Sequence, residues 1–552
     1  MAKTKSSEKL RGADIVAQTL DRAGLRTIFT LSGNHIMPLF DAAIGTELDL
    51  VHVRHEAAAV FMADAYGRLT RTPGIAMVTG GPGHTNAVSA LYTALAAESP
   101  LILLSGHVGR DEIGRGAFQE LPQAAFAAPV TKASWTAASV ATLGHDLAKA
   151  ARIATSGRPG PVHISLPFDI LEEEIADSAR LWPDASAFAP VPMPLSDIAA
   201  DATHAALAAA KQPIILIGPT LCDAPGKALQ RQLSDAIRAP VVGMENPRGL
   251  NDATNGAFAE MLPRADLVVL LGRPHDFAIK FGKPPFVDAA AKFVVIDPDT
   301  GLIERAVREQ AERVLHTAVA DPVSAAQALI ARAPKNPNRA AAWRDEVAAA
   351  VTYQPPAWVE TRSAAGGPLH PLDLSRAVAP IIENDANTIL ICEGGEIGQW
   401  PQALIRPRRR VVNGAAGPIG GAVPFALAAR IVEKKAPIVV MMGDGAFGFH
   451  MAEFETAARL NLPFVVVLGN DAAWNAERQI QIREYGKDRA VGCELTPARY
   501  DQVVQALGGH GEFVTKPDEL KPAIERALAS GKPACINVMI ERVPAPTIRR
   551  GS

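Results

Sequence analysis

Short, almost wholly apolar runs alternate with longer, alanine-rich stretches along most of the chain. Within these runs apolar and polar side chains do not alternate, so both faces of each run are expected to be covered. This pattern predicts parallel strands, and the repeated order of strand and helix predicts an α/β fold of doubly wound parallel sheets. The clearest runs are Ile75–Val78, Leu101–Leu104, Val162–Ser165, Ile214–Ile217, Leu267–Leu271, Phe293–Ile296, Ile438–Met442, Phe464–Leu468 and Cys535–Met539.

Two segments rich in proline, alanine and polar residues interrupt the pattern and predict linkers. The first is Trp182–Pro194, and the second begins at Ala333–Arg339 and continues loosely to about Gly367. A chain of 552 residues is long enough for about three domains of roughly 100–200 residues each. The linkers accordingly divide the chain into three predicted α/β domains, at residues 1–182, 195–332 and 368–545.

Composition narrows the class of protein. The chain carries a net charge of −3 and is 48% hydrophobic, which excludes both a strongly basic nucleic-acid binder and a disordered chain. The longest apolar runs fall far short of the roughly 20 residues that span a bilayer. The four cysteines form no CxxC pair, so neither a zinc site nor a disulfide framework is predicted. The polar first residues contain no signal peptide pattern, and we expect a cytoplasmic protein.

The strongest local signal combines the ends of two apolar runs. One run ends in Gly443-Asp444-Gly445 and the next ends in Asn470-Asp471, with 24 residues, 446 to 469, between them. Ligands of parallel sheets sit at the carboxyl ends of strands, glycine lets the backbone approach a phosphate, and a following helix offers free amide donors. Asp444 and Asp471 would then bind a hard divalent cation, with Mg²⁺ expected, that bridges to phosphate oxygens. Taken alone, the first motif could be a plain turn and the second a helix cap.

This spacing resembles the signature of enzymes that bind thiamine diphosphate (ThDP) and Mg²⁺. The resemblance implies that Asp444, Asp471 and the main-chain carbonyl of Ala473 hold the cation. The signature usually ends in Asn-Asn, so Asp471 stands where the family has an asparagine and adds negative charge beside the diphosphate. By the same resemblance, the turn that binds the cofactor consists of Gly443, Asp444, Gly445 and Ala446.

The first domain resembles the pyrimidine-binding domain of the same enzymes. The stretch RHEAAAVFMADAYGR around Glu56 is similar to the segment that carries the catalytic glutamate in the pyruvate oxidase, acetolactate synthase and benzaldehyde lyase group. The resemblance implies that Glu56 contacts N1′ of the aminopyrimidine and promotes loss of the thiazolium C2 proton, which is general acid–base work. Taken alone, Glu56 would be an ordinary first-turn glutamate stabilised by the helix dipole. The glycine-rich turn Thr79–Asn86 matches the group as well, and it contributes Gly81 and Asn86 to the expected cofactor site.

The third domain carries further glycine-rich stretches after an apolar run. By resemblance, Gly394 and Gly395 flank the diphosphate, and the stretch GAAGPIGG contributes Gly417. Ile419 falls where a bulky apolar residue wedges under ThDP, although plain core packing would explain this residue almost as well.

The resemblance covers almost the full length and also implies an assembly. The central domain of this family sometimes holds FAD or ADP, and we expect neither here. The family builds its active sites at the subunit interface, from the first domain of one subunit and the third domain of its neighbour. We therefore expect a homodimer or homotetramer that acts on a small-molecule substrate.

The substrate-side residues favour a lyase or carboligase that acts on carbon–carbon bonds of 2-hydroxy ketones or 2-keto acids, similar to benzaldehyde lyase. That likeness rests on His35 in the loop after the first strand, Gln119 in the active-site loop and Trp474 after the cation motif. His35, with an ordinary pKa of about 6.5, is expected to relay a proton to the substrate hydroxyl, unless it is a solvated loop histidine. Gln119 is expected to hold the substrate or the pyrimidine, and Trp474 to wall the pocket.

Other functions remain open. An acetolactate synthase-like 2-keto acid decarboxylase or ligase would share the fold, but this chain reads Leu166-Pro167-Phe168 where those enzymes usually have Leu-Pro-Lys, and it lacks their Gln-Trp-Gln stretch. A 2-hydroxyacyl-CoA lyase would share the stretches 114–123 and 281–285. A cofactor-binding protein that has lost catalysis would keep the same motifs. A Rossmann dehydrogenase is disfavoured, because no GxGxxG follows a strand with an acidic residue at the right distance.

Overall fold

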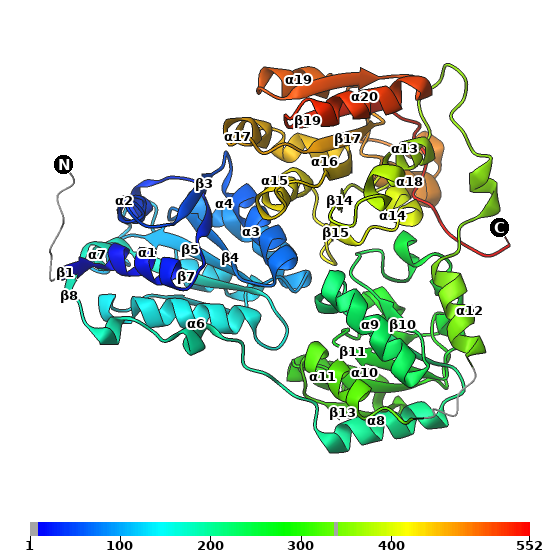
Figure 1. Ribbon diagram of the computed structural model, residues 1–552, viewed down its shortest axis with the longest axis horizontal. Helices are drawn as coiled ribbons and strands as arrows, with labels where there is room; N and C mark the ends of the chain where they lie inside the picture. Colours follow the sequence, from blue (N-terminus) through cyan, green and yellow to red (C-terminus); the bar gives the residue numbers. More distant parts are fainter. Residues whose placement is uncertain (1–8, 336–340, 552) are drawn as a thin grey trace. The chain divides into compact units, whose positions relative to one another are not determined.

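The computed structural model describes residues 9–335 and 341–551. The chain separates into two compact units, Met1–Val191 and Pro192–Ser552, and the boundary falls inside the predicted linker Trp182–Pro194. In the described residues, the first unit holds a six-stranded parallel sheet, and the second holds a five-stranded and a six-stranded parallel sheet (Figure 1). The predicted fold of three doubly wound α/β domains is confirmed.

The N-terminal sheet has the strand order β3-β2-β4-β5-β7-β6 and is parallel throughout. Helices α1 and α6 pack on one face, and α3 and α4 lie on the other (Figure 1). A short antiparallel pair, β1 (Lys9–Arg11) with β8 (Glu174–Ala176), joins the two ends of the domain. The remaining elements are β2 (Thr27–Thr30), β3 (Asp49–His52), β4 (Gly74–Val78), β5 (Leu101–His107), β6 (Ala133–Thr136), β7 (Pro161–Pro167), α1 (Gly12–Arg22), α2 (Met37–Ala42), α3 (Glu56–Thr70), α4 (Pro82–Ala96), α5 (Gln123–Ala127), α6 (Leu143–Thr155) and α7 (Phe168–Glu172).

The central sheet shows why its strands are apolar at every position. Ile214 and Leu216 of one strand pack into the core on one face, while Ile215 and Ile217 pack into a second core on the other face. The strand order is β10-β9-β11-β12-β13. Its elements are β9 (Pro213–Ile217), β10 (Val241–Gly243), β11 (Leu267–Leu271), β12 (Lys292–Ile296), β13 (Val314–Ala318), α8 (Asp197–Ala209), α9 (Ala224–Ile237), α10 (Thr300–Gln310), α11 (Pro322–Ala331) and α12 (Ala342–Val351).

The C-terminal sheet, with order β15-β14-β16-β17-β19-β18, winds in the same way as the N-terminal sheet. The chain passes from β14 outward to β15 and then returns to β16 on the other side, so a topological switch point lies between β14 and β16. Ligands of such sheets bind outside the carboxyl ends of the strands at that point. The elements are β14 (Ile389–Cys392), β15 (Arg409–Val412), β16 (Ile438–Gly443), β17 (Val465–Asn470), β18 (His510–Val514), β19 (Ala534–Met539), α13 (Pro371–Glu383), α14 (Gln399–Leu404), α15 (Ala422–Val432), α16 (Asp444–His450), α17 (Glu453–Arg459), α18 (Asn475–Tyr485), α19 (Tyr500–Ala506) and α20 (Pro517–Ala529).

Each of the nine apolar runs supplies one parallel strand, as predicted. The four cysteines lie within the described residues, where they are buried and form no disulfide. In the described ranges, none of the helices combines the length and the apolar character needed to cross a membrane.

The second predicted linker differs from the structure. Residues 336–340 lie outside the described residues, but the following stretch forms α12, whose Trp343, Val347 and Ala350 pack into the core of the central domain. Their spacing is helical, and the proline-rich flanks concealed it. The central domain therefore extends beyond residue 332, to the end of α12.

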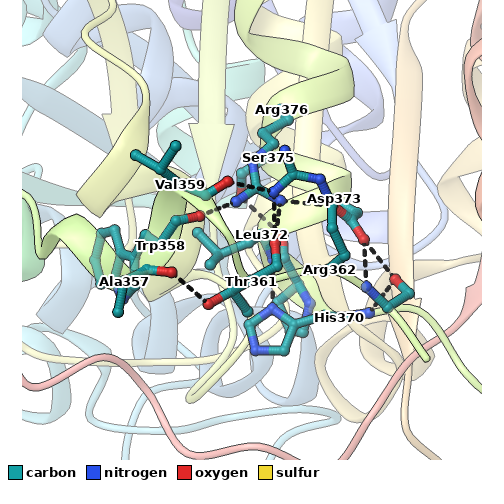
Figure 2. A network of polar contacts seen from close by, with 12 residues as sticks. Ala357, Trp358, Val359, Thr361, Arg362, His370, Leu372, Asp373, Ser375 and Arg376 are labelled. Atoms are coloured by element: carbon teal, nitrogen blue, oxygen red, sulfur yellow. Dashed lines mark hydrogen bonds and ion pairs between the residues drawn. The ribbon is translucent and has the colours of Figure 1, made fainter.

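The rest of that segment is held by a network of polar contacts, shown in Figure 2. Asp373 on α13 accepts hydrogen bonds from the hydroxyl and the backbone N–H of Ser363 at 2.5 and 2.8 Å, and it pairs with Arg376 at 2.6 Å. Arg376 also donates to the carbonyls of Trp358 and Thr361. This single arginine therefore fastens the chain between the central and C-terminal domains onto α13.

The placement of α12 predicts a stability effect. Trp343 is 7% exposed, and its Nε1–H donates to the Pro213 carbonyl at 2.9 Å. Trp343→Ala should therefore lower the free energy of unfolding by about 3–5 kcal/mol, as for other large-to-small core changes. Urea denaturation followed by circular dichroism would measure it.

Arg344, the next residue on α12, is the matched control, because its partner Asp235 is 78% exposed and such surface pairs contribute roughly 0–1 kcal/mol. If Trp343→Ala were no more destabilising than Arg344→Ala, α12 would not belong to the central core.

Candidate active site

The N-terminal domain places Glu56 at the carboxyl edge of its sheet. Glu56 follows β3 and is the first residue of α3, where a negative side chain suits the free amides of the helix N-terminus. Its Oε2 accepts a hydrogen bond from the side chain of Asn86 at 3.1 Å. Glu56 is half-buried and Asn86 is exposed, so the pair is accessible to a ligand. The structure therefore brings together two residues that the sequence assigned to the same cofactor end.

Gly81 and Gln119 also lie in contact. Gly81 has a φ of +56° and precedes α4, and a Cβ atom there would lie 2.7 Å from the Gln119 Cβ. Gln119 itself has a φ of +63°, an unusual conformation for a residue other than glycine that often marks functional loops. The loop that carries Gln119 is thus packed directly on the glycine turn.

His35 is not the solvated histidine that was one alternative. It is 5% exposed, and its Nδ1 lies 3.3 Å from the Thr79 hydroxyl oxygen. The expectation of an ordinary pKa near about 6.5 is wrong, because burial lowers the pKa of His35 and the nearby His107 lowers it further. The imidazole is therefore neutral at neutral pH and can serve as a hydrogen-bond partner or a proton acceptor.

Gln123 is a buried residue of this site that sequence reasoning missed. Its Oε1 accepts from the Gly81 N–H at 2.9 Å, and its Nε2 donates to the Gly106 carbonyl and the Ser165 hydroxyl at 3.0 and 2.9 Å. The side chain thereby connects the glycine turn to the ends of β5 and β7. No local pattern could have revealed this role, because the partners lie far from Gln123 in sequence.

In the second unit, a cavity of about 290 Å³ opens at the carboxyl ends of β14, β16 and β17. Every residue that the sequence assigned to the diphosphate and cation end lines it. Ile419 is half-buried at the cavity wall, and its role under the cofactor stays a prediction. The predicted residues in the lining are Gly394, Gly395, Gly417, Ile419, Gly443, Asp444, Gly445, Ala446, Asp471, Ala473 and Trp474.

Glycine is required at two positions of this wall. Gly394 has a φ of +94°, and a Cβ there would lie 3.0 Å from the backbone nitrogen of Gly443, so the ends of β14 and β16 meet closely. At Gly445 a Cβ would lie 2.6 Å from the ring of Trp474. The indole therefore lies directly on the turn and walls the cavity, as predicted.

The cavity offers hydrogen-bond groups that lack partners. Helices α14, α16 and α18 begin at its edge, and none has a side-chain cap. The positive ends of their dipoles therefore lie at this edge, which favours an anion. In the described residues, Gln399 Oε1 and Asp444 Oδ2 are both buried with no hydrogen-bond partner. A ligand, an ion or a water bound in the cavity would give both atoms a partner.

Asp444 is buried, and Asp471 beside it is half-buried. Their carboxyl groups are in hydrogen-bonding contact, and burial raises the pKa of both, with repulsion from Asp444 adding to the rise at Asp471. Among the residues described, the cavity lining carries four carboxylates (Glu396, Asp444, Asp471 and Glu477) and one arginine, Arg248. This excess of negative charge favours a cation at the paired aspartates.

The turn after Asp471 directs a backbone carbonyl. Ala472 has a φ of +52°, and its N–H donates to the Asn470 side chain at 3.1 Å. Ala473 and Glu494 form an antiparallel bridge in which they share no hydrogen bond; the bonds are made by the residues on either side of them. In such a pair the backbone groups point outward, so the Ala473 carbonyl points away from Glu494. Asp444, Asp471 and the Ala473 carbonyl therefore provide three oxygens on one wall, which suits Mg²⁺.

No group of three or more His, Cys, Asp or Glu side chains able to hold a metal ion occurs in the described ranges. A cation at the paired aspartates would thus need the backbone carbonyl and oxygens of a ligand. The two carboxylates, the orphaned Asp444 oxygen and the uncapped helices fit a cation together with a diphosphate.

Arg248 of the central domain reaches this cavity and was not predicted. It donates to the Gly395 carbonyl at 2.7 Å and lies 3.5 Å from Glu396. A buried pair holds its segment in place, because Arg410 donates to Glu245 at 2.7 Å. The residue comes from a different domain, about 150 positions before the glycines it contacts, and no motif marks it.

Comparison with known proteins supports the same reading of both ends. Residues 10–126 match the N-terminal TPP binding domain of the thiamine pyrophosphate enzymes, and residues 394–538 match their C-terminal TPP binding domain. The first match contains Glu56, and the second contains Asp444 and Asp471.

Three curated relatives align over nearly the whole chain. A probable acetolactate synthase of Mycobacterium bovis is 32% identical over 98% of this chain and 97% of its own length. The 2-hydroxyacyl-CoA lyase 2 of Bos taurus is 29% identical over 98% of this chain and 92% of its own. The oxalyl-CoA decarboxylase of Escherichia coli is 27% identical over 96% of this chain and 95% of its own. The chain therefore belongs to the thiamine diphosphate-dependent enzymes, as a relative of the acetolactate synthases, 2-hydroxyacyl-CoA lyases and oxalyl-CoA decarboxylases.

Proposed function

We propose that this enzyme is a ThDP- and Mg²⁺-dependent carbon–carbon lyase or carboligase that acts on 2-hydroxy ketones or 2-keto acids, similar to benzaldehyde lyase. The observation that carries the proposal is the pair of Asp444, which is buried, and Asp471, which is half-buried, at the switch point of the C-terminal sheet, with one oxygen of Asp444 unpartnered in the described structure. A diphosphate and Mg²⁺ account for the uncapped helices and the paired carboxylates together.

The residues divide between two ends of the cofactor. Asp444, Asp471 and the Ala473 carbonyl would hold Mg²⁺, and the amides around Gly445 and Ala446 would bind the diphosphate. When bound, ThDP supplies a carbanion that attacks carbonyl groups and an electron sink for the product of that attack. Glu56 would hold a proton at its carboxyl group next to the pyrimidine, with Asn86 orienting the carboxyl through the 3.1 Å hydrogen bond.

Residues on the substrate side favour an apolar or aromatic substituent. The Trp474 ring on Gly445 and the half-buried Ile419 give the cavity apolar walls. Gln119 would donate or accept hydrogen bonds with substrate oxygens. The neutral His35 would accept a proton from the substrate hydroxyl and return it, and the Thr79 hydroxyl would orient its ring.

We further propose an assembly of two or four identical chains in the cytoplasm. In it, the Glu56 end of one chain and the Asp444 end of its partner would complete one site. The exposure of Asn86 in the single chain supports this arrangement.

A second candidate is a lyase acting on 2-hydroxyacyl-CoA thioesters. One relative is named for that chemistry, the 2-hydroxyacyl-CoA lyase 2, and a second, the oxalyl-CoA decarboxylase, is named for another CoA thioester; both align over more than nine-tenths of the chain. Phe168 and the residues after Trp474 differ from the acetolactate synthase pattern. These differences do not distinguish the 2-hydroxyacyl-CoA lyase from the benzaldehyde lyase-like enzyme.

Removing one aspartate tests the cation site. Asp444→Asn should weaken ThDP binding in the presence of Mg²⁺ by at least the roughly 10–100-fold that loss of a metal-supporting group costs, measured by calorimetry. The apo variant should melt at the same temperature as wild type or higher, because a buried, unpaired charge is removed. Asp518→Asn, at an exposed position on α20, should change neither value, and unchanged ThDP affinity in Asp444→Asn would contradict the site.

Removing the Glu56 carboxylate tests the catalytic role. Glu56→Gln should keep the fold and the ThDP affinity within a few-fold but lower turnover by about 100-fold or more, the usual size of a general acid–base contribution. Glu47→Gln, at a 69% exposed position before β3, is the control and should turn over like wild type. Near-wild-type turnover in Glu56→Gln would refute the assignment.

A substrate panel decides the reaction. With ThDP and Mg²⁺, we expect cleavage of benzoin and related 2-hydroxy ketones to aldehydes, detected by mass spectrometry, and no product with Glu56→Gln. Formation of acetolactate from pyruvate alone would support the acetolactate synthase alternative. Cleavage restricted to 2-hydroxyacyl-CoA would support the second candidate.

A further inference from the structure

Arg542, in the segment after β19, contacts the turn that carries the cation ligands. Its Nε donates to the Asp471 carbonyl at 2.7 Å and its NH2 group to the Ala472 carbonyl at 2.9 Å. The segment runs beside α18 (Figure 1), where the Asn475 side chain donates to the Val543 carbonyl at 3.1 Å. The planar guanidinium therefore bridges two consecutive carbonyls of the same turn.

This contact holds a backbone conformation that is unfavourable by itself. A non-glycine residue at positive φ, such as Ala472 at +52°, costs of the order of 1–3 kcal/mol and persists only when its surroundings impose it. The Asn470 side chain fixes the N–H of Ala472, and Arg542 fixes the carbonyls on either side of the Ala472 nitrogen and α-carbon. Together they determine where the Ala473 carbonyl points.

The charge of Arg542 is also placed to act on the cavity. The lining carries four carboxylates and one arginine among the described residues, and the positive charge of Arg542 acts on the Asp471 carboxyl from behind the turn. The guanidinium also pairs with Glu494 at 2.7 Å, and Arg478 faces the same carboxylate at 3.5 Å. Because the Glu494 side chain is 66% exposed, solvent screens it more than it screens the half-buried Asp471.

We propose that Arg542 is a positioning residue of the cofactor site, which fixes the turn Asp471–Ala473 and offsets the charge of Asp471 so that an anionic diphosphate can bind beside two carboxylates. The inference rests on the proposed ThDP and Mg²⁺ site. It means that the segment after β19 affects the affinity for the ligand, although Arg542 itself does not line the cavity.

The test measures the dissociation constant of ThDP at saturating Mg²⁺ by calorimetry in a set of full-length variants. Arg542→Gln should weaken ThDP binding by about tenfold or more, the size expected for one charge at short range in a partly screened site. Arg542→Lys keeps the charge but loses the planar fork that spans two carbonyls. Its ThDP affinity should lie between those of wild type and Arg542→Gln. Glu494→Gln removes the exposed partner and leaves the turn contacts, and it should stay within about threefold of wild type.

A double-mutant cycle separates the charge effect from general damage. In the Asp471→Asn background, Arg542→Gln should weaken ThDP binding by no more than about threefold, because the charge that Arg542 offsets is gone. A purely structural role would give the same loss in both backgrounds. Circular dichroism and the melting temperature of each apo variant show whether it has folded.

The proposal is overturned if Arg542→Gln binds ThDP like wild type, or if the loss is equal with Asp and with Asn at position 471. If Arg542→Gln fails to fold, Arg542→Lys tests the turn contacts alone: it should weaken ThDP binding by a similar factor in both backgrounds because it keeps the charge, and wild-type affinity in Arg542→Lys would overturn the role of the fork. Failure of the proposed function looks different, because wild type itself would then show no Mg²⁺-dependent ThDP binding.

Discussion

Two carboxylates held side by side at the edge of a parallel sheet are the constraint on which the C-terminal half of this structure depends. Asp444 is buried and Asp471 is half-buried, and the loss of water around them raises the pKa of both. Asp444 directly follows β16 and Asp471 directly follows β17. These two strands are paired in the sheet, and the pairing fixes both residues in place. The close approach at Gly394 and Gly445 and the uncapped helices all surround this pair, and all suit a cation that carries an anion with it.

The N-terminal site is built differently. Its buried polar side chains His35 and Gln123 connect strand ends without bringing charge, and the half-buried carboxylate of Glu56 is hydrogen-bonded to Asn86. The two sheets share one strand order, yet the C-terminal edge carries two carboxylates in contact and the N-terminal edge carries a glutamate held by an amide side chain. Side chains at equivalent strand ends, rather than the winding of the chain, therefore decide which part of a ligand each domain can bind.

Sequence reasoning succeeded where the chemistry is contiguous. The turn at Gly443–Gly445, the pair at Asp471 and the wall residue Trp474 are close in sequence, and a strand end followed by glycine has few other uses. It failed where the partner comes from elsewhere. Arg248 reaches the cavity from another domain, and Arg542 contacts the turn behind the cavity from the segment after the last strand. Neither residue belongs to a pattern. For His35 the residue type was visible, but its burial, which sets its protonation state, depends on how the surrounding elements pack.

The indole of Trp474 has a practical consequence. It rests on the backbone of Gly445 and meets the ring of Phe449 edge to face, with centroids 6.5 Å apart. Any molecule that settles on this turn changes the polarity around a fluorophore already in van der Waals contact with it. The fluorescence of Trp474 should therefore report ligand binding. Because Trp474 is one of six tryptophans, replacing it by phenylalanine would show how much of the protein's fluorescence comes from it.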